Sequence, residues 1–468
     1  MVHNVDVKSI DGGPAISVGK GLARLCRLAR HAIWFWVGQM GRPGLCLTLS
    51  VALAGILTAP STAAGFCVLA HEAVVDAVWQ DGIVPTLKER FPHASESAIR
   101  EARAYAYGGS LIQDLGYYPF GSRRFSNLVH YVRSGDFVEA LVRASQDVNE
   151  YAFALGALAH HASDSFGHSI AVNRAVPIIY PKLRAKYGDE VLYANSPSRH
   201  VMVEFAFDVL EVARGAFKSD VYQQLIGFEV AKPVLERAFR DTYGLELEQV
   251  FGDTDLAIGT YRRAVSTIIP DLTRLAWREK HDEILAATPH ITERDVVYTM
   301  TRRQYEDAFG STYRKPGLLA RFVVTIFKIV PKFGPFRPLA FTPLTPETER
   351  MFREGFAASC ERVRASLRAL RSGRLAVNDA DLDTGKRSAF GANPLADETY
   401  ADLLQELARR KFAGVPAALS RNINEHYALK SVPRDASRKL RKQEQEASRN
   451  LAALNASQPQ NGSARLPE

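Results

Sequence analysis

Two histidines and an aspartate recur at four-residue spacing in the segment EYAFALGALAHHASDSFGHSIAVN, at His160, Asp164 and His168. Residues four apart lie on one face of an α-helix, with a drift of about 40° per step. The spacing therefore predicts a helix that aligns an imidazole, a carboxylate and a second imidazole. Farther along, His200 and Glu204 repeat the spacing. Zinc binds histidine nitrogen and carboxylate oxygen, so the two segments predict a helical site for more than one metal ion.

The histidines of the chain are concentrated in this region. Seven of the twelve lie between residues 71 and 200, and their spacing with carboxylates argues against isolated core or surface histidines. His160 keeps the four-residue register with Asp164, whereas the next residue, His161, points about 100° away on a helix. We therefore expect His160 to bind metal and His161 to support or pack against the site.

The rest of the pattern predicts an all-α protein. From Val68 to about Tyr313 apolar residues recur at spacings of three and four, and no run alternates as a strand does. Ser95 precedes one such run and is a candidate helix N-cap. The segment DFVEALVRASQDVNEYAFALGALAHHASD is largely apolar and predicts one long buried helix. Gly108, Gly109 and Gly116 indicate helix breaks or close contacts between helices.

The N-terminal region resembles a secretory signal. Residues 40–65 contain a basic start at Met40 and Arg42, an apolar stretch from Leu45 to Leu57, and a small-residue cleavage site that ends at Gly65. We expect residues 1–65 to be a signal region, with Met40 as the translation start, and the mature protein to be secreted or periplasmic. The alternatives are a long basic leader and an N-terminal membrane anchor, for which the apolar stretch is short.

The C-terminal part divides into an extension and a tail. Residues 314–430 contain further helical patterns and predict a C-terminal helical extension of the domain at 66–313. Within it, residues 318–341 are apolar, basic and rich in proline. They predict a core helix with a proline-rich connector, or alternatively a segment that lies at a lipid surface. Residues 431–468 are polar and predict a disordered tail.

Three aspartates alternate in the extension, at Asp379, Asp381 and Asp383. This alternation hints at calcium, but the glycine and the distal glutamate of an EF-hand loop are not at the required places. We therefore predict a solvated loop.

Net charge and cysteine content limit the partners and the metal chemistry. The net charge of +8 favours anionic partners such as phospholipid surfaces, nucleic acid or phosphorylated substrates. The four cysteines form no CxxC pair, so neither a cysteine zinc site nor a disulfide framework is indicated. No obligate protein partner is inferred.

Taken together and in this order, the candidate ligands resemble those of the zinc-dependent phospholipase C superfamily, which includes single-strand-specific zinc nucleases of the same fold. The resemblance covers roughly residues 66–210, and its motifs are the His-x3-Asp and His-x3-Glu pairs. It implies a multi-helix bundle that is secreted and holds up to three zinc ions in a cleft. The residues that carry it are His71, Asp114, His130, His160, Asp164, His168, His200 and Glu204.

The resemblance also implies how these residues divide among the ions. The first zinc would be bound by Asp114, His130, His160 and Asp164, and the second by His168, His200 and Glu204. The third would be bound by His71 and Asp164, with Asp164 bridging to the first. Family members complete the third site with the backbone amine and carbonyl of the mature N-terminal residue, which here would be Phe66 after cleavage behind Gly65.

The chain departs from the family pattern next to the bridging aspartate. The family has a glycine before this aspartate and a longer gap, with a proline, before the following histidine. This chain has Ser163 before Asp164 and only three residues before His168. We therefore expect the second zinc site to differ in geometry and the chain to be a divergent member.

The resemblance implies a phosphoric-ester hydrolase of the phospholipase C type. A hydroxide between the first and third zincs is expected to attack phosphorus, and Asp114 to serve as ligand and as catalytic proton acceptor. Tyr117, Tyr118 and Phe120 either line the cleft or simply pack. A phospholipid membrane surface is the expected substrate. The alternatives are a nuclease or 3′-nucleotidase, with nucleic acid as substrate, and a non-catalytic zinc-stabilised binding protein.

Overall fold

The protein is described by a computed structural model that covers residues 68–118, 120–213, 229–279, 344–429 and 438–457, with five single positions between 281 and 293. These residues form helices and the turns that join them, and none of them belongs to a strand. Their one β contact is an isolated bridge between Asp381 and Lys386. The predicted all-α class is confirmed.

The helices follow one another along the chain with short connections. The first group is α3 (Val68–Val78), η1 (Trp79–Ile83), α4 (Val84–Arg90), α5 (Glu96–Leu111), η2 (Ile112–Tyr117), α6 (Arg123–Tyr131), α7 (Ser134–Ala144), α8 (Val148–Gly167), η3 (His168–Val172), α9 (Asn173–Ile179), α10 (Pro181–Tyr187), η4 (Tyr193–Asn195) and α11 (Pro197–Ala213). The second group is α13 (Lys232–Tyr243), α14 (Leu247–Phe251), α15 (Thr254–Glu279), α20 (Pro346–Arg371), α21 (Pro394–Arg409), α22 (Ala417–Ala428) and α23 (Arg438–Ser457).

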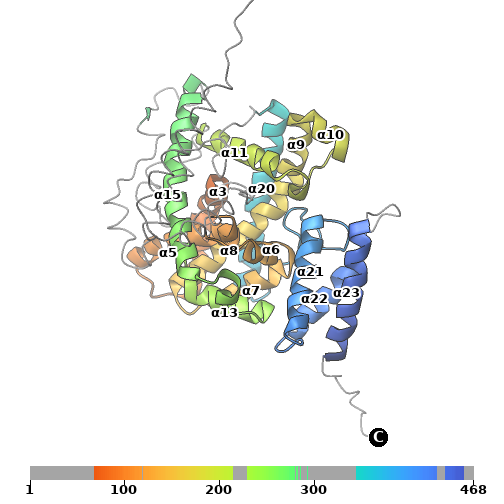
Figure 1. Cartoon of the computed structure of the whole chain (residues 1–468). Coiled ribbons are helices and arrows are strands. Elements are labelled where there is room, and N and C mark those ends of the chain that lie inside the picture. The colour runs from red at the N-terminus through yellow and green to blue at the C-terminus, as the bar shows by residue number, and fades with distance from the viewer. Residues whose placement is uncertain are drawn as a thin grey trace, which may run out of the picture. The chain divides into compact units, whose positions relative to one another are not determined.

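Helix α8 is the central helix of the fold and packs against α5, α7 and α20 (Figure 1). Nearly all of its side chains are buried, as its apolar sequence predicts. The single long helix that we predicted is, however, two helices. Asp147 ends the connection after α7 and caps α8, because its carboxylate accepts hydrogen bonds from the backbone N–H groups of Asn149 and Glu150 at 2.9 and 2.8 Å.

Two glycines let α5 and α8 approach each other closely. A Cβ atom on Gly109 would lie 1.9 Å from the carbonyl oxygen of Phe153, and one on Gly156 would lie 2.0 Å from that of Ala106. Gly109 therefore marks a close contact between helices, Gly108 lies against the backbone of Glu229, and neither breaks α5. Ser95 caps the start of α5, where its hydroxyl accepts a hydrogen bond from the Ala98 N–H, as predicted.

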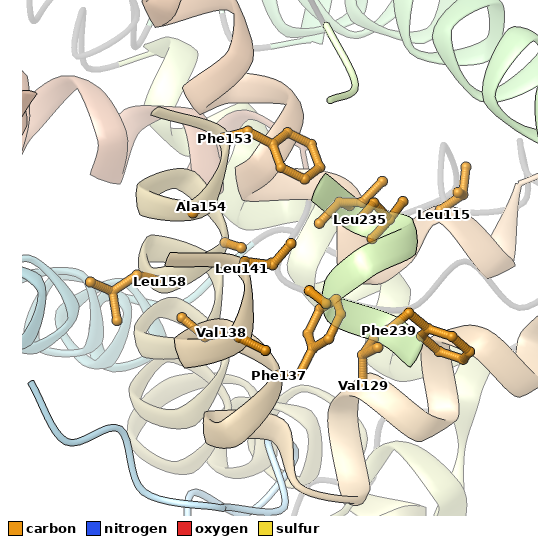
Figure 2. Packing of buried hydrophobic residues seen from close by; sticks show 14 of the residues in the cluster. Leu115, Val129, Phe137, Val138, Leu141, Phe153, Ala154, Leu158, Leu235 and Phe239 are labelled. Carbon is orange, nitrogen blue, oxygen red and sulfur yellow. The ribbon is translucent and has the colours of Figure 1, made fainter. Parts of the chain in front are cut away.

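The main hydrophobic core lies where α7, α8 and α13 meet. Phe137 and Leu141 of α7 lie beside Phe239 and Leu235 of α13, with Phe153 of α8 close by (Figure 2). All five side chains are completely shielded from water. Each buried apolar side chain of this size contributes about 1.5–3 kcal/mol to folding. This cluster therefore fixes the position of α8, which carries part of the polar site described below.

Helix α20 belongs to this same core. The sequence analysis assigned it to a C-terminal extension, but α20 packs along α8 and α3, and its side chains Cys360, Val363 and Leu367 join the main cluster. Residues 346–371 of the predicted extension therefore share the hydrophobic core of the predicted zinc domain. The reason is the apolar stripe of α20, which repeats at helical spacing and covers the faces of α8 and α3 that α5 and α7 leave open.

The prediction of a disordered tail is wrong for residues 438–457, which form α23. This helix packs against α21 and α22. Ala447, Leu451 and Leu454 lie at spacings of four and three, so they share one helix face. Ala447 and Leu454 are buried and Leu451 packs beside them. This polar segment packs as a helix because Ala447, Leu451 and Leu454 lie together on that face.

Several predictions concern residues outside the described ranges: the signal region 1–65, Phe66, residues 318–341, and residues 430–437 and 458–468. Among the described residues, no helix is long and apolar enough to cross a membrane.

Candidate metal centre

Asp164 lies at the middle of a cluster of imidazoles. Its carboxylate is completely buried, and its oxygens lie 3.4 Å from His71 Nε2, 3.2 Å from His130 Nε2, 3.3 Å from His160 Nε2 and 3.9 Å from His168 Nε2. Neither oxygen accepts a regular hydrogen bond. Burial alone would raise the pKa of Asp164, but the charges of His160 and His168 hold it well below its usual range. A buried, ionised carboxylate in this setting requires a cation.

Two imidazoles are oriented by backbone carbonyls. His130 on α6 contacts the Ser126 carbonyl through Nδ1 at 2.7 Å, and His160 on α8 contacts the Ser110 carbonyl through Nδ1 at 2.8 Å. Because a carbonyl only accepts hydrogen bonds, Nδ1 carries the proton in both rings and Nε2 is left to bind a metal. The two Nε2 atoms point at each other across 3.4 Å.

These atoms have the mutual distances of ligands on one zinc ion. Tetrahedral zinc with bonds of about 2.0–2.1 Å places neighbouring ligand atoms about 3.3 Å apart. His130 Nε2 lies 3.4 Å from Asp114 Oδ1 and 3.2 Å from Asp164 Oδ2, which is itself 3.3 Å from His160 Nε2. Asp114 comes from η2, at the end of α5, and is 4 % exposed. The structure thus brings together the four residues expected at the first site.

The group expected at the third zinc site shares Asp164 with the first. His71 on α3 faces Asp164 Oδ1, the oxygen opposite the one that faces His130 and His160. Its ring stacks on that of His160 at 4.3 Å, and burial lowers the pKa of His71 well below its usual value. His71, His160 and Asp164 can form a metal-binding group. The two oxygens of Asp164 therefore point in the directions that a bridging carboxylate needs.

The group expected at the second zinc site contains His168, His200 and Glu204, which can also form a metal-binding group. His200 and Glu204 lie one turn apart on α11, and Glu204 Oε1 is 2.8 Å from His200 Nδ1 and 3.5 Å from His168 Nε2. All three side chains are buried. Burial lowers the pKa of His200 to about 3 and raises the pKa of Glu204 to about 8, so the imidazole is neutral, as a metal ligand must be.

The helical geometry after α8 changes at His168, in the group expected at the second zinc site. Helix α8 ends at Gly167, and His168 opens the π-turn η3. The wider turn places residues five apart on one face, so Asn173 follows His168 into the site. The π-turn directly follows the metal-binding helix, at the place where the chain departs from the family pattern, and the expected difference from the family's second zinc site stays a prediction.

Two site residues were missed by the sequence analysis. The aspartate loop is not solvated: Asp381 and Asp383 are 3 % and 2 % exposed. Asp383 Oδ1 lies 3.6 Å from His168 Nδ1 and 3.8 Å from His200 Nε2. Asn173 Oδ1 lies 2.8 Å from His200 Nε2. The alternating aspartates were the only sequence signal for Asp383, and the position of Asn173 depends on a π-turn that the sequence does not announce.

His161 faces away from the cluster, as its position next to His160 predicts. Its Nε2 lies 3.1 Å from the carbonyl oxygen of Asn378, in the loop that follows α20. Burial lowers the pKa of His161 to about 4, so it is a neutral residue that packs behind α8. Of the predicted ligands, only Phe66 lies outside the described residues.

The donor set fits zinc. It consists of imidazole nitrogens and carboxylate oxygens without cysteine sulfur, arranged in three buried groups that meet at Asp164. Such a site is typical of a helical, zinc-dependent protein with several candidate metal-binding groups.

Residues 70–253 match the family described as zinc dependent phospholipase C. This match supports membership of the zinc-dependent phospholipase C superfamily, and the matched segment contains every predicted ligand except Phe66. No curated protein and no solved structure matches the chain. Asp383 lies well beyond the matched segment.

Proposed function

We propose that the protein is a secreted, zinc-dependent phosphoric-ester hydrolase that cleaves phospholipids in the manner of a phospholipase C. The observation that carries the proposal is the bridging position of Asp164, which lies within 3.2–3.9 Å of imidazoles from all three groups. Zinc bound there supplies Lewis acidity toward phosphoryl oxygens and makes water a nucleophile near neutral pH.

Asp114 is the residue best placed to handle a proton in this site. Burial raises the pKa of its carboxyl group, against the opposing effect of His130, which suits a proton acceptor better than an ordinary aspartate. Tyr117, three residues later, is only partly buried and lies edge-on to His130 at 6.1 Å between ring centroids. Its side chain therefore lies beside the first group.

Phe120 supports a lipid substrate. It is 40 % exposed and lies in the turn after η2, six residues beyond Asp114. Its only counterpart among large apolar side chains of the described residues is Leu429, at 42 %. An exposed aromatic ring close in sequence to Asp114 would insert among acyl chains. Tyr118, by contrast, packs against Tyr261 at 4.9 Å and serves the core.

The test compares vesicles of phosphatidylcholine and phosphatidylethanolamine with single-stranded DNA as substrates of the zinc-loaded, secreted protein. We expect diacylglycerol and a phosphorylated headgroup as products. His160→Ala should abolish turnover, while the matched change in its neighbour, His161→Ala, should preserve it. Cleavage of DNA alone would support the nuclease alternative, and no cleavage of either substrate would leave a zinc-stabilised binding protein.

A second comparison tests the lipid contact. Phe120→Ser should lower turnover on vesicles and leave turnover of a short-chain, monomeric phospholipid unchanged. Leu429→Ser is the matched control, because it removes an equally exposed apolar side chain far along the chain from the site. Equal loss with both variants on vesicles would contradict a specific contact at Phe120.

A further inference from the structure

The rings of His168 and His200 each present one nitrogen to Glu204 and the other away from it. His168 Nε2 lies 3.5 Å from Glu204 Oε1, and its Nδ1 lies 3.6 Å from Asp383 Oδ1. His200 Nδ1 lies 2.8 Å from Glu204 Oε1, and its Nε2 lies 2.8 Å from Asn173 Oδ1 and 3.8 Å from Asp383 Oδ1. Both imidazoles therefore lie between Glu204 on the metal side and Asp383 with Asn173 on the other.

His168 needs a partner on its outer side. It is 4 % exposed, and neither ring nitrogen makes a hydrogen bond in the structure. A buried polar group of this kind is costly unless it is satisfied. Asp383 is the acidic group that faces its Nδ1, and a carboxylate can accept the proton that this nitrogen carries.

The backbone around Asp383 fixes its position. The Leu382 N–H donates to the His130 carbonyl at 3.1 Å, and the Asp383 carbonyl accepts a hydrogen bond from Asn173 Nδ2 at 2.6 Å. The Asp383 carboxylate accepts the Tyr193 N–H at 3.1 Å. Asp383 and the preceding residue, Leu382, are thus held by hydrogen bonds to three separate elements, α6, α9 and η4.

The other two aspartates of the alternating motif have a different role. Asp381 accepts hydrogen bonds from the backbone N–H groups of Asp383 and Thr384 at 3.0 and 3.2 Å and from Asn393 Nδ2 at 2.9 Å. Asp379 accepts one from the Asp136 N–H at 3.0 Å. Their carboxylates shape and anchor the loop. Only Asp383 reaches the imidazoles, so the motif does not gather its three carboxylates around one cation.

The loop is packed tightly against the metal-binding helix. Gly385 has a positive φ of 67°, and a Cβ atom there would lie 2.4 Å from the Ser165 carbonyl oxygen. The Ser134 hydroxyl bonds both the carbonyl and the N–H of Ala380, at 2.6 and 3.0 Å. The position of Asp383 relative to α8 is therefore set by contacts on both sides of it along the chain.

We propose that Asp383 is a positioning residue of the second zinc site. It holds His168 with the proton on Nδ1 and, with Asn173, holds His200 with the proton on Nε2. This leaves His168 Nε2 and His200 Nδ1, both facing Glu204, to bind the metal. A carboxylate behind a ligating imidazole fixes its tautomer and raises its basicity, and its loss lowers metal affinity about 10–100-fold. The inference rests on the proposed zinc occupancy and adds a residue from outside the family-matched segment.

The experiment measures zinc retention by the full chain. Wild type, Asp383→Ala, Asp383→Asn and the loop control Asp379→Asn are dialysed against graded concentrations of a zinc chelator, and zinc per chain is determined by elemental analysis. Folding is followed by circular dichroism. The visible spectrum of the cobalt-substituted protein reports the geometry of the sites independently of turnover.

We expect Asp383→Ala to release one zinc about 10–100-fold more readily than wild type while the remaining zinc is retained. Asp383→Asn keeps an acceptor oxygen without the charge and should fall between the two. Asp379→Asn should match wild type. If Asp383→Ala fails to fold, the Asn variant decides the question.

Wild-type retention in a folded Asp383 variant, or equal loss of zinc with Asp379→Asn, would overturn the inference. In the latter case the loop matters only as a fold element. A wild-type protein that binds no zinc would instead overturn the proposed function, so the two failures are distinguishable.

Discussion

Replacing Asp164 by asparagine tests the metal centre most directly, because this change keeps the shape of the side chain and removes its charge. Asp164 is completely buried and faces imidazoles of all three groups. Its Oδ1 faces the third predicted site through His71, and its Oδ2 faces the first through His130. We therefore expect Asp164→Asn to lose two zinc ions and to retain the one held by His168, His200 and Glu204.

The magnitude follows from the distances. At 3.2 Å from a protonated His130, a unit charge interacts with about 5 kcal/mol at an effective dielectric constant near 20, and breaking a buried pair costs about 3–5 kcal/mol. The zinc-free variant should therefore melt about 4–6 °C below zinc-free wild type, at about 1.2 °C per kcal/mol for a unit of about 400 residues. Each zinc at a thousandfold excess over its Kd adds about 4 kcal/mol, so the zinc-induced stabilisation should fall to about a third.

The assay combines zinc analysis after gel filtration with thermal unfolding, each with and without a chelator. Asp397→Asn is the matched control. That aspartate is also buried, at 2 % exposure, but it accepts the Gly391 N–H in the C-terminal helices and has no contact with the metal centre. The control should lower the melting temperature and retain all zinc. A wild-type zinc content in Asp164→Asn would refute the bridging role.

Three further predictions concern pH, helix contact and the C-terminal helix. Burial alone would lower the pKa values of His130 and His168, but nearby carboxylates raise them to about 10 and 9. The contribution of these two histidines to the stability of the zinc-free protein is therefore full below pH 6.5 and is lost as pH rises through 9–10. Because zinc displaces these protons, it should stabilise the protein increasingly from pH 6 to 8.5. A zinc-induced shift of the melting temperature that is constant over this range would contradict the assignment. Gly109→Ala should destabilise the protein by about 1–3 kcal/mol in denaturant unfolding, since its Cβ would meet the Phe153 carbonyl, and an unchanged midpoint would refute the close contact. Leu454→Ala should cost about 2–3 kcal/mol by the same measurement, because the side chain is fully buried, whereas a disordered tail would give no change.

The sequence is informative where function depends on local spacing. His160, Asp164 and His168 share a helix face because the helical period dictates it, and His200 with Glu204 follows the same rule. The cap at Ser95 is equally local. The division between α7 and α8 was missed because apolar residues at helical spacing lie on both sides of the polar residues around Asp147, although its carboxylate is a good helix cap.

The parts that could not be predicted depend on distant contacts. Asp381 and Asp383 look like residues of a solvated loop, and only the contacts with His130, Asn173 and Tyr193 bury them. Likewise, the polarity of residues 438–457 predicts disorder, and the apolar face made by Ala447 and Leu454 becomes meaningful only when α21 is there to receive it.

Because α20 and the aspartate loop pack onto α8, the contacts around the candidate metal centre cannot all form until these late segments of the chain are available. A growing chain that extends only to residue 253 already carries the histidines and carboxylates of the family-matched segment. It does not yet have the helix that covers α8 or the carboxylate at position 383. Contacts between residues so far apart in sequence form slowly during folding. The packing that encloses the candidate metal centre therefore forms only after residues 346–383 have been synthesised, well after the family-matched segment.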